Sequence, residues 1–97
     1  MMLSHVVVVK LKDRSSKNIE STRVLLDSLK GKIPGLRDLV VGIDVGGSKL
    51  AYDIVLVAKF DDVKGLQGYR EHPLHVPVVN KLMELAESVA VVDYKSD

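Results

Sequence analysis

Four stretches of the chain have hydrophobic patterns typical of β-strands. The first, 5–11, reads His-Val-Val-Val-Val-Lys-Leu and is apolar on both faces at its centre, as in a strand buried on both sides. β-branched residues such as valine favour strands because they fit the pleated surface. Comparable stretches at 36–45, about 52–60 and 88–94 predict three more strands.

Helical spacing replaces alternation between the first and second predicted strands. Ser15 or Ser16 is a suitable N-cap, and Gly31 is predicted to end the helix. Ile33-Pro34-Gly35 then predicts a turn in which the glycine takes a positive φ. The apolar or small residues of this helix recur three and four positions apart: Ile19, Thr22, Leu25, Leu26 and Leu29.

Two further helical segments are predicted before the last strand. Asp61 and Asp62 cap a short helix that Gly65 and Gly68 weaken. A second segment opens near Pro73. It is predicted to kink or to begin at Pro77, because proline cannot donate a backbone N–H. Four residues are expected to continue its inward face: Val79, Leu82, Met83 and Ala86.

The order β-α-β-β-α(α)-β predicts an α+β, ferredoxin-like fold. Residues 1–97 would form one domain, a four-stranded antiparallel sheet with its helices on one face. The chain is 46% hydrophobic, mostly valine and leucine, and has few helices with which to cover a sheet that is apolar on both faces. We therefore expect a homodimer, a dimeric α/β barrel in which two copies pack through their sheet faces.

Charge and cysteine content exclude several classes of function. Fourteen basic and 13 acidic residues leave a net charge of +1, which gives no electrostatic case for binding nucleic acid or an anionic membrane. The nearest approach to a basic stripe, Lys10 to Lys17, is interpreted as a solvated strand end. The absence of cysteine excludes disulfides and thiolate metal sites. With no signal-peptide pattern and no long apolar segment, we expect a soluble cytoplasmic protein.

The chemically distinctive stretch is 69–79, which contains a tyrosine, two histidines and two prolines. His75 and Tyr69 fall on inward-facing helical positions, and His5 enters from the first strand. We predict that these three side chains converge at one end of an apolar cavity. A histidine there can act as a general base, and a tyrosine hydroxyl can orient a carbonyl group. The predicted cavity walls are Val7, Val9, Leu26, Val79 and Leu82.

Each of these side chains also has a purely structural interpretation. His72, directly before Pro73, is best explained as a residue that caps backbone groups. His75 is equally well explained as a hydrogen-bonded core histidine. His5 can be interpreted as an anchor of its strand, and Tyr69 can be interpreted as core packing. No carboxylate completes a metal site with the histidines, so we expect neither a metal nor a cofactor.

Four motifs in the same order resemble the stress-responsive A/B barrel family, or Dabb, from about His5 to Tyr94. They are the sequence of 5–12, Ile-Pro-Gly-Leu at 33–36, His-Pro-Leu-His-Val at 72–76 and Val-Asp-Tyr at 92–94. The resemblance implies a dimeric α+β barrel. One branch of that family comprises polyketide cyclases that close an aromatic ring by aldol condensation.

The resemblance to the cyclase branch assigns roles to three residues. The catalytic base of that branch falls on His75, an assisting tyrosine on Tyr69 and a first-strand histidine on His5. A further cavity tyrosine of that branch falls near Leu26, which has no hydroxyl group.

Three functions remain open at this stage. The first is a homodimer that binds a small apolar or carbonyl-containing molecule. The alternative is a cofactor-independent lyase or cyclase with His75 as general base. The third is a stable stress-protection protein whose histidines are architectural. A cofactor-independent monooxygenase is a more distant option.

Overall fold

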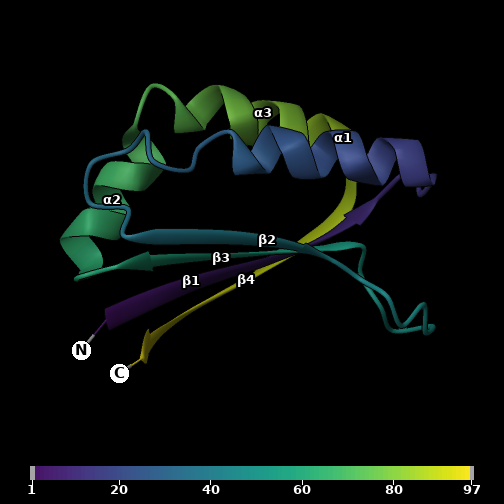
Figure 1. Ribbon diagram of the computed structural model, residues 1–97, viewed down its shortest axis with the longest axis horizontal. Coiled ribbons are helices and arrows are strands. Elements are labelled where there is room, and N and C mark those ends of the chain that lie inside the picture. The colour runs from purple at the N-terminus through teal and green to yellow at the C-terminus, as the bar shows by residue number, and fades with distance from the viewer. Residues whose placement is uncertain (1, 97) are drawn as a thin grey trace.

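The computed structural model describes residues 2–96, which form one four-stranded sheet and three helices (Figure 1). Helices α1 and α3 lie side by side over one face of the sheet, and α2 lies near one end of it (Figure 1). The elements are, in chain order, β1 (Met2–Leu11), α1 (Ser16–Asp27), β2 (Asp38–Ile43), β3 (Ile54–Phe60), α2 (Val63–Glu71), α3 (His75–Leu85) and β4 (Ala86–Ser96).

The strand order β2-β3-β1-β4, with every neighbouring pair antiparallel, confirms the predicted ferredoxin-like arrangement. β1 is central, and its register determines which residues meet across the sheet. His5 lies opposite Ala58 of β3 and opposite Asp93 of β4. The first and last strands therefore bring together residues from the two ends of the chain.

Strand and helix limits differ from the sequence-based expectation where a turn competes with regular structure. β2 begins two residues later than the predicted 36–45, because the N–H of Leu36 already donates to the carbonyl of Ile33 in the preceding turn, and it ends at Ile43. Helix α1 ends at Asp27, four residues before Gly31, and residues 28–32 form turns in which Gly31 has φ +75°. Gly35 has φ +85°, which confirms the predicted positive-φ turn.

Helix α3 begins at His75, two residues before the start predicted at Pro77. Pro77 occupies the first turn, where backbone N–H groups have no partner inside the helix, and its missing N–H costs little there. The predicted inward face is confirmed at Leu82 and Ala86, which are both buried, although Ala86 opens β4. Met83 is 57% exposed, and Val78 is also buried.

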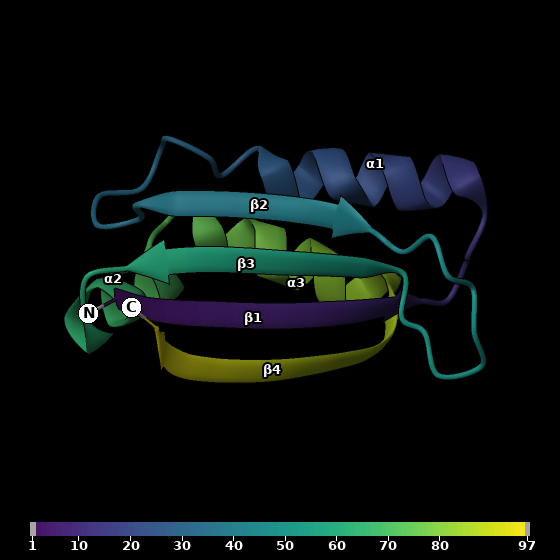
Figure 2. The same cartoon turned by 60° about the horizontal axis from the view of Figure 1, so that its bottom comes forward.

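The hydrophobic core fills the space between the sheet and the helices. Its largest fully buried side chains include Tyr69, Phe60, Leu11 and Leu39. The opposite face of the sheet carries no helix (Figure 2). On that face Val92 is 62% exposed. Three more apolar residues there are also substantially exposed: Val40, Ala90 and Tyr94.

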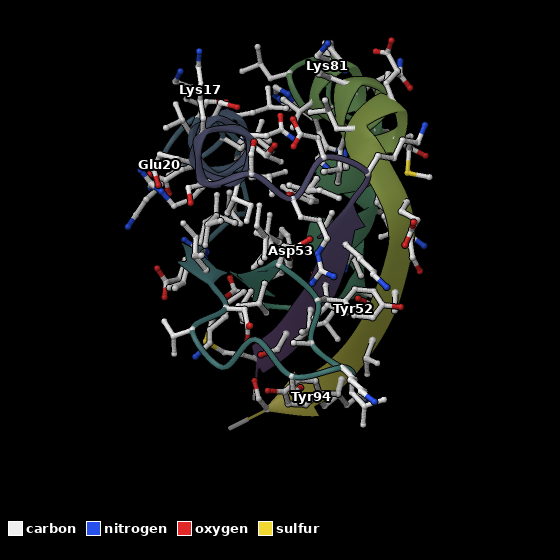
Figure 3. All side chains as sticks on the ribbon, turned by 90° about the vertical axis from the view of Figure 1, so that its right-hand side faces the viewer. Lys17, Glu20, Tyr52, Asp53, Lys81 and Tyr94 are labelled. Atoms are coloured by element: carbon white, nitrogen blue, oxygen red, sulfur yellow. The ribbon has the colours of Figure 1, made fainter. Side chains whose placement is uncertain are left out.

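Asp53 is a buried carboxylate that the sequence analysis did not single out. It lies just before β3, and Figure 3 shows it inside the molecule, while Tyr94 lies on the side of the sheet away from the helices. The Leu11 N–H donates to its Oδ2 (2.9 Å) and Arg14 Nε donates to its Oδ1 (3.0 Å). Asp53 thus ties the start of β3 to the end of β1. Within residues 2–96, no helix is long and apolar enough to span a membrane.

Candidate ligand cavity

A cavity of about 230 Å³ lies between the sheet and the helices. Most of its wall is leucine, valine and methionine contributed by α1, α3, β1, β3 and β4. Its polar lining residues are His5, Tyr69, Arg70 and His75. A wider depression of about 480 Å³ near Met2 and Asp61 is more open and contains no histidine or tyrosine. The smaller cavity is therefore the candidate site.

The three side chains predicted to converge do lie together in this cavity. The ring centroids of His5 and Tyr69 are 6.0 Å apart, and those of Tyr69 and His75 are 4.1 Å apart. Tyr69 thus lies near both imidazoles. Its own α2 and the following α3 meet at this point, because His72 ends the first helix and His75 begins the second.

Four of the five predicted wall residues line the cavity: Val7, Leu26, Val79 and Leu82. Val9 does not. It lies farther along β1, opposite Ile54 and Val89, and packs there in the core with no exposed surface. The β-strand alternation that places Val9 on the same face as Val7 does not reveal where the cavity ends.

The hydrogen bond of His75 defines the nitrogen available for chemistry. Its Nδ1 lies 3.2 Å from the Arg70 carbonyl oxygen. Since a carbonyl oxygen can only accept, Nδ1 carries the proton and Nε2 carries the lone pair. Burial lowers the pKa of His75 below its ordinary value of 6.5, and the bond to Arg70 opposes this in part. The imidazole is therefore neutral near pH 7.

Tyr69 presents a hydroxyl group that remains protonated. Its side chain is 1% exposed and packs against Phe60, with ring centroids 5.1 Å apart. Burial raises the pKa of Tyr69 to about 12. Among residues 2–96, no hydrogen bond involves its hydroxyl oxygen. The group can therefore act as a donor to a ligand in the cavity.

A carboxylate links two of the polar residues that line the cavity. Asp93 of β4 accepts from His5 Nδ1 through Oδ1 (2.5 Å) and from Arg70 Nη2 through Oδ2 (2.8 Å). Sequence reasoning missed Asp93 and Arg70 as site residues. The signal for Asp93 was present, because it follows Val89 and Val91 on the inward-facing positions of the last strand.

His72 caps a turn and does not line the cavity. Its backbone is the C-cap of α2, and its Nδ1 accepts from the Leu74 N–H (3.1 Å). The capping interpretation is confirmed. Over the described part of the chain, no three histidine or acidic side chains are grouped closely enough to hold a metal ion.

Comparison with known proteins gives a family and a shared fold. The family model described as the stress responsive A/B barrel domain, Dabb, matches residues 3–96. A dimeric protein with a ferredoxin-like fold from Bacteroides fragilis is 30% identical, with a TM-score of 0.82 over 98% of this chain and 96% of that one. No curated protein matches the chain significantly.

Two further solved structures are similar in fold alone. A dimeric ferredoxin-like protein from Thermobifida fusca is 24% identical, with a TM-score of 0.86 over 99% of this chain and 92% of that one. Hydroxynitrile lyase from Passiflora edulis is 17% identical, with a TM-score of 0.85 over 99% of this chain and 94% of that one.

Proposed function

The chain belongs to the stress responsive A/B barrel (Dabb) family, and we propose that it is a homodimer that binds a small apolar or carbonyl-containing molecule. The observation that carries this proposal is the cavity beneath α1 and α3, whose apolar walls lead to a cluster of polar groups at one end. That combination is characteristic of small-molecule sites. The expected cytoplasmic location belongs to the same proposal.

The size and lining of the cavity support a small ligand. Its volume of about 230 Å³ lies below the range of roughly 300–1,000 Å³ that is typical of sites for drug-sized ligands. The leucine and valine walls favour an apolar body, since burial of apolar surface stabilises binding by about 25 cal/mol per Å² before the costs of association. Tyr69 lines the cavity, and its hydroxyl would donate to the carbonyl oxygen of such a ligand.

The homodimer is proposed to form through the sheet face that carries no helix. Apolar side chains on that face, including Val40 and Val92, are more than half exposed in the single chain. Exposed apolar patches of this kind mark interfaces. The 30% identical relative from Bacteroides fragilis is itself dimeric. A second copy of the chain is therefore the proposed partner.

Binding can be tested by filling the cavity. Leu26 is 3% exposed and lines the cavity, so Leu26→Phe should occupy ligand space without altering the surface. Val24→Phe is the matched control, because Val24 is on the same helix and is 53% exposed. We expect 2-octanone and benzoate to shift the methyl NMR signals of Val7 and Leu82 in the wild type and in Val24→Phe but not in Leu26→Phe. If the wild type responds to no member of such a panel, the architectural interpretation replaces this one.

The second candidate function is a cofactor-independent lyase or cyclase. The specific observation that favours it is the tautomer of His75: a neutral imidazole with its lone pair on Nε2, beside the donor hydroxyl of Tyr69. His75 would remove a proton next to a carbonyl group while Tyr69 donates to the developing oxyanion. The hydroxynitrile lyase of Passiflora edulis shows that enzymes occur on this fold, although a shared fold does not define activity.

Proton abstraction can be measured without knowledge of the complete reaction. We expect the protein to accelerate deuterium incorporation next to the carbonyl of 2-octanone in D₂O, and His75→Ala to abolish the acceleration. His72→Asn is the control, because His72 does not line the cavity. Equal exchange by wild type and His75→Ala, both folded by circular dichroism, would remove His75 from a catalytic role.

A further inference from the structure

Arg70 lies at the boundary between the cavity and the surface. It lines the cavity together with His75 and Val79, and the same three residues line a recess of about 270 Å³ on the outside. The Arg70 side chain is 50% exposed, so its charge does not carry the full cost of burial. A ligand whose body fills the apolar cavity would place its head group next to this guanidinium.

The guanidinium has donors that the protein does not use. Arginine has five N–H groups, and within residues 2–96 the guanidinium makes one hydrogen bond, from Nη2 to Asp93. Arg37 provides the contrast within the same chain. Both its Nε and its Nη2 donate to Asp61, at 3.1 and 2.6 Å, and it lines none of the cavities described above. Arg37 uses two of its five N–H groups on one carboxylate and lies away from these cavities, whereas Arg70 uses one, retains four and lines the cavity.

The charges around Arg70 come from four elements. Asp93 of β4 is the acidic group, and the imidazoles are those of His5 on β1, His75 on α3 and His72, the C-cap residue of α2. Arg70 carries the permanent positive charge. An anion bound at this end would therefore interact with the permanent positive charge of Arg70, which also pairs with Asp93.

We infer that Arg70 is an anion-binding residue of the cavity and that the ligand is an amphipathic monocarboxylic acid. Its apolar chain occupies the cavity and its carboxylate pairs with the unused N–H groups of Arg70. This deepens the proposed function and rests on it. A planar guanidinium suits a carboxylate because two parallel N–H···O bonds can form. The wall of leucine and valine selects an acid with an apolar chain over a small polar one.

The test separates the charge of the ligand from its apolar body. Octanoate and octanamide have the same chain and a carbonyl group but differ in charge, and acetate has the charge without the chain. Calorimetric titration of the wild-type dimer should show octanoate binding at least about tenfold more tightly than octanamide, as expected for a charge-assisted hydrogen bond. Acetate should not bind detectably.

Variants assign the preference to Arg70. Arg70→Gln should weaken octanoate binding by about tenfold or more and leave octanamide binding within about twofold. Arg70→Lys, which keeps the charge but not the planar fork, should give intermediate binding. Arg37→Gln is the matched control and should change the affinity for neither octanoate nor octanamide. If Arg70 had only a structural role, Arg70→Gln would lower the affinity for both ligands together, and this result would overturn the inference.

Failure of this inference is distinguishable from failure of the proposed function. If octanoate and octanamide bind the wild type equally, or if Arg70→Gln retains the preference for octanoate, the carboxylate assignment is overturned and the cavity remains a binding site. If neither compound binds, both are overturned. As an independent readout, bound octanoate should raise the NMR-measured pKa of His75, because it adds a negative charge nearby, and octanamide should not.

Discussion

At His75, burial and hydrogen bonding act on the imidazole in opposite directions. Burial lowers its pKa, the hydrogen bond to the Arg70 carbonyl raises it, and the positive charge of Arg70 lowers it again. The net result is a neutral ring with a defined tautomer at neutral pH. Such a ring is suited to accept a proton or a hydrogen bond from a ligand, and Tyr69 beside it is suited to donate one.

The lowered pKa of His75 predicts how stability depends on pH. Because the folded chain holds this proton less tightly than the unfolded chain, whose pKa lies near 6.5, the unfolded chain binds more protons between 6.5 and the folded value. The free energy of unfolding should therefore fall as pH decreases through this window.

Urea unfolding of the wild type and of His75→Gln at about pH 7.5 and about pH 5.5 would measure the effect. The wild type should lose more stability on acidification than His75→Gln, which lacks the titrating group. Identical losses in the two proteins would mean that His75 does not titrate differently in the folded and unfolded chains.

At the scale of elements, the junction between α2 and α3 forms the site. Two short helices that meet between His72 and His75 place Tyr69 at the end of one and His75 at the start of the other, so that their rings come into contact. Their types and approximate positions could be predicted from capping and proline patterns. The exact start of α3 could not, because Pro77 is compatible with any position in a first turn.

Asp53 has a comparable role at the other end of the sheet, and its removal should destabilise the fold. Asp53→Ala would leave the buried Leu11 N–H without its acceptor and would also break the contact with Arg14. We expect the free energy of unfolding to fall by about 2 kcal/mol.

Chemical denaturation of Asp53→Ala and of Asp61→Ala would check this prediction. Asp61 is the matched control because it also pairs with an arginine but is fully on the surface, with 60% of its side chain exposed. Asp61→Ala should lower the free energy of unfolding much less, because exposed ion pairs contribute little to stability. A loss in Asp61→Ala as large as in Asp53→Ala would contradict the importance of burial here.

At the scale of the whole molecule, the order of elements was predictable but the site was only partly so. Strand and helix periodicity, with the capping residues, are local signals, and they predicted the ferredoxin-like arrangement. The bridge from His5 through Asp93 to Arg70 is not local. It joins residues 88 positions apart and depends on the β1–β4 register, which no single stretch of sequence specifies.

The proposed dimer predicts that charge on the uncovered sheet face will separate the protomers. Val92→Lys places a cation on an exposed valine of that face, and Val24→Lys places one on the outer side of α1, where the exposure is similar at 53%. Light scattering at micromolar concentration should show a monomer for Val92→Lys and a dimer for the wild type and Val24→Lys. A wild-type monomer would contradict the sheet-to-sheet model.

β4 contributes to the two proposed surfaces at once. Asp93 bonds to His5 and Arg70 on the cavity side, whereas its neighbours Val92 and Tyr94 point to the uncovered side. Because alternate side chains project from one backbone, a displacement of this strand moves both sets together. If a ligand binds the dimer more tightly than the monomer, then ligand binding must strengthen dimer association by the same factor. If the ligand prefers the dimer, its affinity varies with protein concentration, and titrations at different dilutions would report that coupling.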